Sequence, residues 1–99
     1  MKQKILASML FVSALAAAEG DAVFKARCTA CHGSDGKGKS AIGTPDFTSA
    51  KTQSGISDAD IIDTITNGRK GTIMPAWKGK LSDEEIAAVA AYLRSLGRK

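Results

Sequence analysis

The sequence has few of the residues that build disulfide frameworks and zinc sites. It contains two cysteines and one histidine in 99 residues. Two cysteines allow at most one disulfide, and three Cys/His ligands are one short of the four that a structural zinc site requires. No segment alternates apolar and polar residues as a β-strand does, and no internal repeat is present. These absences predict one small all-α domain.

Long apolar runs are also lacking beyond the N-terminus. Lys2 and Lys4 precede an apolar stretch over residues 5–15, and the alanines that follow offer a cleavage site. The stretch is too short to cross a bilayer as a stable helix, and no nearby cysteine would carry a lipid anchor. We predict a cleaved signal peptide over residues 1–18, a mature domain over 19–99, and export to the periplasm. An uncleaved amphipathic N-terminus is the alternative.

The scarce cysteines and the single histidine lie together. Residues 28–32 read Cys28-Thr29-Ala30-Cys31-His32, the C-x-x-C-H arrangement that attaches a c-type haem. Each thiol can add to one haem vinyl group, and the adjacent imidazole is then placed to ligate the iron. A thioredoxin-like redox pair would need a βαβ setting, and a plain disulfide would leave His32 without a purpose. The motif therefore predicts one covalently bound haem c.

A haem with one histidine ligand has a second axial position. Once residues 1–18 are removed, Met74 is the only methionine left, and no second histidine exists. Pro75 fixes the backbone beside it, which favours a stiff ligand loop over a core-filling role for Met74. Histidine and methionine together raise the reduction potential of haem iron. Because both axial positions are then filled, we predict an electron carrier and not an enzyme.

Capping signals predict three main helices. The first begins near Asp21 as its N-cap. The second begins after Ser57, carries Ile61, Ile62 and Ile65 on one side and stops at Asn67-Gly68.

The third helix has the clearest signals. Ser82 and Glu85 form a capping box, Leu81 and Ile86 are spaced as a hydrophobic staple, and Gly97 stands at the C-cap. The segments 33–57 and 69–80 are predicted loops, with a short extra turn in the longer one. A loop that long in so small a domain suggests that it packs on the haem.

One motif is misleading. Residues 33–40, GSDGKGKS, match the phosphate-loop pattern G-x-x-x-x-G-K-[ST]. That motif must follow a buried strand and open a helix, whereas here it follows the haem segment and Pro45 comes soon after. We therefore expect no nucleotide binding, and its glycines are better explained as letting the loop bend close to the haem.

The net charge of +4 comes from 14 basic and 10 acidic residues. Loss of Lys2 and Lys4 leaves 12 basic residues against 10 acidic ones, a balance too even to indicate nucleic-acid binding. The basic residues nevertheless gather in two loop regions, at Lys25, Arg27, Lys37 and Lys39 and at Arg69, Lys70, Lys78 and Lys80. They either steer a redox partner or are ordinary solvated loop charges.

Taken together, the chain resembles the class I monohaem cytochromes c, and the small soluble bacterial and algal members most. The resemblance rests on Gly20, Phe24, Cys28, Cys31, His32, Met74-Pro75-Ala76-Trp77 and Ala91-Tyr92-Leu93.

The resemblance implies a fold and several roles. The first and last helices would cross where Gly20 and Phe24 meet Tyr92. A carbonyl of Pro45 or Gly43 would accept a hydrogen bond from His32 Nδ1, which fixes the ring of an iron ligand. Trp77 would cover the haem and needs a partner for its indole N–H, such as a haem propionate.

These observations predict a periplasmic, diffusible, monomeric one-electron carrier that does not span the membrane. Its partners would be a redox donor and acceptor, such as a cytochrome complex, an oxidase or a reductase. Respiratory, photosynthetic and denitrifying chains all remain open. Two alternatives stay open as well: a peroxidase-like haem enzyme or gas sensor in which Met74 is labile, and a subunit docked permanently in a larger redox complex.

Overall fold

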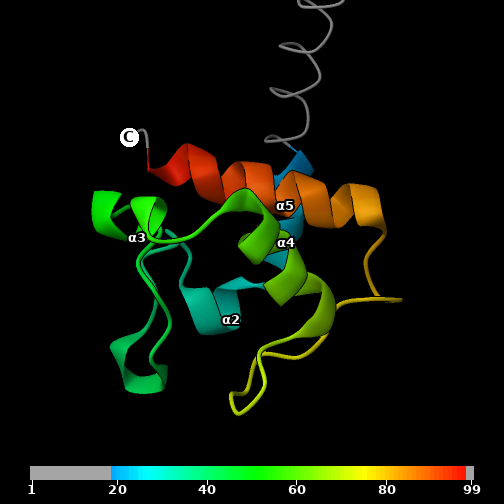
Figure 1. Cartoon of the computed structure of the whole chain (residues 1–99), viewed down its shortest axis with the longest axis horizontal. Helices are drawn as coiled ribbons and strands as arrows, with labels where there is room; N and C mark the ends of the chain where they lie inside the picture. Colours follow the sequence, from blue (N-terminus) through cyan, green and yellow to red (C-terminus); the bar gives the residue numbers. More distant parts are fainter. Residues whose placement is uncertain (1–18, 98–99) are drawn as a thin grey trace, which may run out of the picture.

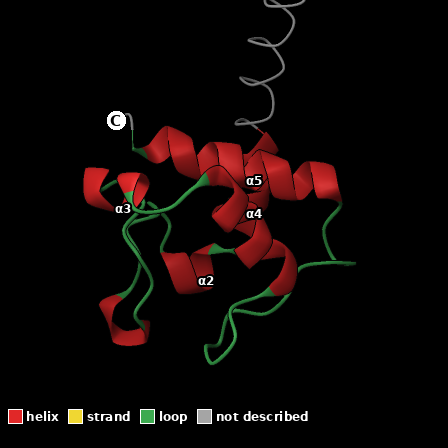
Figure 2. Cartoon of the chain, viewed as in Figure 1, coloured by secondary structure: helices red, strands yellow, loops and turns green. Residues whose placement is uncertain are grey.

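The computed structural model describes residues 19–97, so the predicted signal peptide lies outside the described residues. Within this range the chain is helical, and it contains no β-strand beyond an isolated bridge between Lys78 and Leu81 (Figure 2). The elements are a helical segment over 19–27, α2 (Thr29–His32), the 3₁₀ turn η1 (Ser40–Ile42), α3 (Ala50–Ser54), α4 (Asp58–Asn67) and α5 (Asp83–Leu96). Among these helices none has the length and apolarity needed to cross a membrane. The all-α prediction is confirmed.

The first helical segment already includes residue 19, so the prediction that Asp21 caps it is wrong. Asp21 lies inside the helix and forms an i,i+4 ion pair with Lys25, with 3.2 Å between Oδ1 and Nζ. The segment ends at residue 27, and α2 continues the chain after Cys28. Asp21 thus supports the helix through a side-chain pair and not through a cap.

The first segment crosses α5 at close range, as predicted (Figure 1). Gly20 is buried, and a Cβ at this position would overlap the carbonyl of Ala88 and lie 2.9 Å from Tyr92 Cβ. One turn later, the rings of Phe24 and Tyr92 pack with centroids 5.3 Å apart. Only glycine permits this approach of the two backbones.

Helix α4 starts and stops where the sequence predicts. The Ser57 side chain accepts from the Asp60 N–H while the Asp60 carboxylate accepts from the Ser57 N–H, and the helix ends at Asn67. Ile61 and Ile65 are buried, but Ile62 is 39% exposed. The apolar side of α4 is therefore narrower than predicted, because Ile62 is turned about 100° from Ile61 around the helix axis.

Helix α5 supplies much of the core. Its predicted capping box of Ser82 and Glu85 is present, and Gly97 is the C-cap residue. Leu81 and Ile86 are both buried, in accord with the predicted staple. The core joins residues of every larger element, namely Phe24, Phe47, Ile61, Ile65, Leu81, Ile86, Val89, Ala90, Tyr92, Leu93 and Leu96.

Two loops extend on the side of the molecule away from α5 (Figure 1). One follows α2 and contains η1, and the chain then returns to α3, which lies beside the C-terminal end of α5 (Figure 1). The long segment 33–57 therefore holds two short helical turns where one was expected. The other follows α4 and contains Met74. Together with α2, these loops enclose the candidate site.

Candidate haem site

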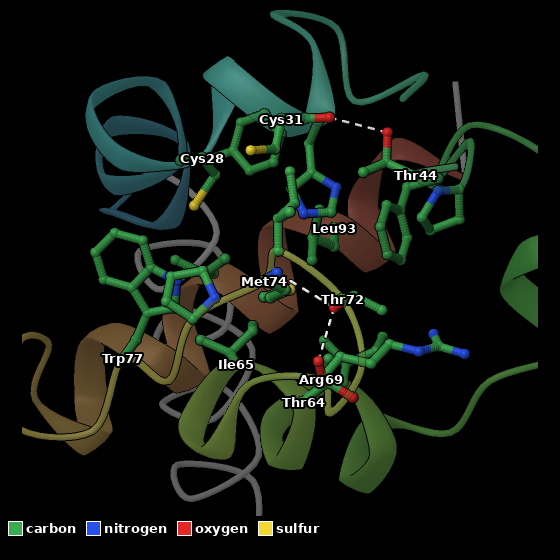
Figure 3. A pocket seen from close by; sticks show the side chains of 18 of the residues that line it. Cys28, Cys31, Thr44, Thr64, Ile65, Arg69, Thr72, Met74, Trp77 and Leu93 are labelled. Carbon is green, nitrogen blue, oxygen red and sulfur yellow. Dashed lines mark hydrogen bonds between the residues drawn. The ribbon is translucent and has the colours of Figure 1, made fainter. Parts of the chain in front are cut away.

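A cavity of about 390 Å³ lies between α2, α4, α5 and the two loops (Figure 3). All seven residues that the sequence analysis singled out for the site line it: Cys28, Cys31, His32, Gly43, Pro45, Met74 and Trp77. Most of the remaining lining is apolar and includes Phe24, Ile61, Ile65, Val89 and Leu93. The fold therefore brings both ends of the predicted ligand set, far apart in sequence, to one apolar cavity.

The two cysteines flank the start of α2, and no disulfide joins them. Cys28 N–H donates to the Phe24 carbonyl at 2.8 Å, which joins α2 to the preceding helical segment. Burial, and secondarily the neighbouring Cys31, raises the pKa of the Cys28 thiol to about 11. A redox-active C-x-x-C pair lowers the pKa of its attacking thiol, so this environment opposes the thioredoxin-like alternative.

His32 is the last residue of α2, and its N–H donates to the Cys28 carbonyl at 3.0 Å. Its ring lies near two phenylalanines, with centroids 6.3 Å from Phe24 and 6.1 Å from Phe47. Burial lowers the pKa of the imidazole, so the neutral form that binds metals is favoured.

The Nδ1 atom of His32 is buried without a hydrogen-bond partner. The position of the imidazole beside two thiols in an apolar cavity fits a ring that would ligate iron through Nε2, and the buried Nδ1 would then need an acceptor such as a backbone carbonyl. Pro45 and Gly43 both line the cavity, but no hydrogen bond joins either carbonyl to Nδ1. The specific carbonyl partner of His32 stays a prediction.

Met74 is half-buried in a loop that is held to the end of α4. Trp77 N–H donates to the Ile65 carbonyl at 3.0 Å, and Lys78 N–H donates to the Thr66 carbonyl at 3.1 Å. Gly68 has a φ of +75°, and a Cβ there would lie 2.9 Å from the Met74 carbonyl oxygen. The loop therefore packs against the C-terminal end of α4, from which it starts, and this contact fixes where Met74 enters the cavity.

Trp77 is half-buried against the core, and Figure 3 shows its indole at the edge of the site. The ammonium group of Lys80 lies 5.6 Å from the centre of this ring, a cation–π contact. Its placement agrees with a residue that covers one side of a bound group. The expected partner for the indole N–H of Trp77, a haem propionate, stays a prediction.

The sequence analysis missed two residues that support the site. Phe47 is buried in a segment rich in Ser, Thr and Gly, where a single aromatic was the only signal. Thr44 Oγ1 donates to the Cys31 carbonyl at 2.9 Å and accepts from Lys39 N–H at 2.6 Å. Thr44 therefore ties the loop that contains η1 to the C-x-x-C-H segment, as Figure 3 shows.

The segment 33–40 does not have the setting of a phosphate-binding loop. It follows α2 and not a strand, and the helix that it opens is only the three-residue turn η1. Gly38 has a φ of +82°, and a Cβ there would meet the carbonyl oxygen of Pro45 at 2.6 Å. Its glycines serve close packing inside the loop.

Comparison with known proteins gives this geometry a family. The family described as "Cytochrome C oxidase, cbb3-type, subunit III" matches residues 15–93. The chain belongs to this family of c-type cytochromes. It is 46% identical over 81 residues to the cbb3-type cytochrome c oxidase subunit FixP of Bradyrhizobium sp. (strain ORS 278) and 40% identical over 80 residues to subunit CcoP of Cereibacter sphaeroides. These matches cover 82% and 81% of the chain but only 28% and 27% of the two relatives.

Solved c-type cytochromes share the fold. The KustC0563 c-type cytochrome superposes with a TM-score of 0.71 at 31% identity, covering 78% of this chain and 95% of that one. Cytochrome cL of Methylophaga aminisulfidivorans gives a TM-score of 0.66 at 26% identity, covering 81% of this chain and 52% of that one. The resemblance to the class I monohaem cytochromes c is thus confirmed. The cofactor of this cytochrome is covalently bound haem c with its iron.

Proposed function

We propose that this cytochrome is a one-electron carrier in which Cys28 and Cys31 hold the haem and His32 and Met74 ligate its iron. The observation that supports the proposal most is that the C-x-x-C-H segment and the Met74 loop line one apolar cavity. When bound, haem c supplies a one-electron couple between Fe(III) and Fe(II). Histidine and methionine as the two protein ligands would favour the reduced iron and so raise the reduction potential.

The protein contributes anchoring, orientation and exclusion of water. The two thiols fix the edge of the cofactor to α2, and the neutral His32 ring lies near Phe24 and Phe47. The Met74 loop is closed by hydrogen bonds to α4, so its thioether enters the cavity with little loss of conformational entropy. With both His32 and Met74 bound to the iron, no coordination position would remain for a substrate, which supports a carrier over an enzyme.

The mouth of the cavity has the chemistry of a transient redox interface. Ile42 and Ile73 line the cavity and are 42% and 68% exposed. Arg27 and Arg69 also line it and are exposed. We propose that this apolar and basic rim meets an acidic surface of the redox partner, since opposite charges speed the encounter of the two proteins.

We further propose that the partner is a terminal oxidase of the cbb3 type. The support is that the relatives of this cytochrome are named subunits of such oxidases, although the chain spans little more than a quarter of their length. This cytochrome would act either as a diffusible carrier in the periplasm or as a docked subunit of the oxidase. Co-migration with the oxidase in size-exclusion chromatography at physiological salt favours the docked form, and separate elution favours the diffusible form.

An enzyme or gas sensor would need Met74 to leave the iron readily. The hydrogen bonds that hold the Met74 loop on α4 oppose this alternative. Carbon monoxide separates the two functions, because it binds reduced haem rapidly only where a coordination position is open. Rapid, tight binding to the wild-type protein at neutral pH would favour the enzyme or sensor.

The central test is an absorption spectrum of the mature protein in both oxidation states. We expect the α and β bands of a low-spin c-type haem on reduction, and the weak long-wavelength band of an Fe(III)–sulfur bond on oxidation. A colourless secreted protein with two free thiols, made in a host that matures c-type cytochromes, would overturn the proposal.

A further inference from the structure

The ring of His32 has two aromatic neighbours that belong to different parts of the chain. Phe24 comes from the first helical segment and Phe47 from the loop between η1 and α3, with ring centroids 6.3 Å and 6.1 Å from the imidazole. Both phenylalanine rings are buried. The orientation of the imidazole therefore depends on what holds these two rings in place.

Both phenylalanines are connected to α5, Phe24 by direct packing and Phe47 through hydrogen bonds of Gln53. Phe24 packs on Tyr92 through apolar contact, with centroids 5.3 Å apart. Phe47 has no aromatic neighbour on α5 among the residues described, and its backbone is fixed instead. Its N–H donates to the Gly36 carbonyl at 2.9 Å, and its carbonyl accepts from Gln53 Nε2 at 2.6 Å.

Gln53 connects Phe47 to α5 through a fully used amide. Besides Phe47, its Nε2 group donates to the Leu93 carbonyl at 2.8 Å. Its Oε1 accepts from Arg94 Nη1 at 3.0 Å, and the same nitrogen donates to the Gln53 carbonyl at 2.6 Å. Because a guanidinium only donates, Arg94 requires the amide oxygen to face it, and the two N–H groups are left for the two carbonyls.

The partly buried Gln53 side chain packs closely against the C-terminal end of α5. A Cβ added at Gly97 would lie 2.5 Å from Gln53 Cγ. Arg94 is itself anchored, since it also donates to the Ile56 carbonyl and, at 2.5 Å, to the Asp58 carboxylate. These contacts hold the Gln53 amide in one orientation. Gln53 therefore links the backbone of Phe47 to the C-terminal turn of α5.

We propose that Gln53 is a positioning residue for the proximal ligand: by fixing Phe47 it sets the plane of the His32 imidazole and so tunes the bound iron. This inference rests on the proposed function, in which His32 ligates the haem. The plane of an axial imidazole determines how unpaired electron density spreads over the haem in the ferric state. Loss of the Gln53 contacts would let the Phe47 side chain, and with it the His32 imidazole, adopt a range of positions.

Two variants test the role of Gln53 in the mature ferric holoprotein. Gln53→Met keeps the chain length and removes every hydrogen bond of the amide. Gln53→Glu keeps an acceptor for Arg94 but places a carboxylate oxygen against the Phe47 and Leu93 carbonyls. We expect both to change the spread of the haem-methyl proton resonances and to shift the midpoint potential, while the long-wavelength Fe(III)–sulfur band remains.

Asp58→Asn is the matched control. It weakens the Arg94 anchor of the same network but leaves both carbonyl contacts of Gln53 in place. We expect it to lower the denaturation midpoint without changing the haem-methyl spread or the potential. Unchanged resonances and potential in both Gln53 variants, or equal changes in Asp58→Asn, would overturn the inference and leave only a structural role.

Phe47→Leu provides a second measurement if the Gln53 variants fail to accumulate haem. It keeps an apolar side chain and the Gln53 hydrogen bond to its backbone, and it removes the ring beside His32. A haem-methyl pattern identical to that of the wild type would sink the inference. A wild-type spectrum without low-spin histidine-ligated haem would instead refute the proposed function, so the two failures are distinguishable.

Discussion

The backbone N–H of Arg69 donates a 3.2 Å hydrogen bond to the carbonyl of Met74, which closes the loop after α4 on itself. The hydroxyl of Thr72 donates to the Arg69 carbonyl at 2.7 Å and accepts from Met74 N–H at 3.2 Å, inside the same loop (Figure 3). A ligand on so short and closed a loop has few alternative positions. Met74 is therefore the residue whose replacement tests the site most directly.

Replacement of Met74 by leucine should open the sixth position of the iron. Leucine keeps the apolar volume but has no thioether, so the Fe(III)–sulfur band should vanish and the reduction potential should fall. Carbon monoxide should then bind the reduced protein rapidly. Lys70→Ala is the control, because Lys70 is exposed on the same loop and does not line the cavity. An intact long-wavelength band in Met74→Leu would show that another group ligates the iron.

Gly20→Ala should destabilise the protein, although alanine is normally the better helix former by about 1 kcal/mol. The new Cβ would overlap the Ala88 carbonyl and force the first helical segment off α5. We expect a loss of about 1–3 kcal/mol in the free energy of unfolding, measured by urea denaturation of the ferric protein. Ala22→Ser, on an exposed face of the same helix, should change little. A more stable Gly20→Ala variant would contradict the helix crossing.

Removal of the haem should unfold much of the chain. Without the cofactor, the apolar side chains that line the cavity would face water and the small core would lose the surface on which they pack. Cys28→Ser/Cys31→Ser, expressed without attached haem, should therefore have little helical circular dichroism. Native-like helix content in this double variant would show that the cofactor is not part of the core.

Asp60→Asn should weaken the start of α4 in a pH-dependent way. Hydrogen bonds from Ser57 hold the pKa of the Asp60 carboxyl below its ordinary value of 3.8. A lowered folded-state pKa means that the carboxylate stabilises the protein above pH 3.8 and that this contribution disappears as the pH falls through the folded-state pKa. Denaturation midpoints of wild type and variant should thus differ at pH 7, and the difference should shrink as the pH falls below 3.8.

Asp63→Asn, in the middle of the same helix, serves as the control for this capping effect. Asp63 accepts from Asn67 Nδ2 at 2.7 Å, at the C-terminal end of the helix and away from the capping box. Its replacement should not produce the same convergence. A constant difference between Asp60→Asn and wild type from pH 7 to pH 3 would exclude the ionised capping box as a source of stability.

Arg69→Glu should slow electron transfer with an acidic redox partner. Arg69 is exposed at the cavity mouth, so the reversed charge opposes the encounter, by about tenfold at low ionic strength. Lys51→Glu is the control, since Lys51 is exposed on α3 and does not line the cavity. Stopped-flow rates should fall with salt in the wild type. Rates that rise with salt, or do not respond, would remove the basic rim from the mechanism.

The sequence by itself determined the chemistry of the cofactor and the ends of α4 and α5. The C-x-x-C-H segment places two thiols and an imidazole within five residues, so no tertiary structure is needed to see the haem attachment. The capping boxes of Ser57 with Asp60 and of Ser82 with Glu85 are equally local, because each is formed within one turn. Local hydrogen bonds are readable from spacing alone.

Tertiary structure decided what depends on contacts between distant segments. The sequence gives no sign that Phe47 lies beside His32, since a long loop must first fold back on α2. Gln53 reads as an ordinary polar residue until α5 supplies the Leu93 carbonyl and the Arg94 guanidinium. Asp21 was misjudged as a cap because its role depends on where the helix begins and not on its residue type. Non-local packing fixes these positions, and spacing along the chain does not encode it.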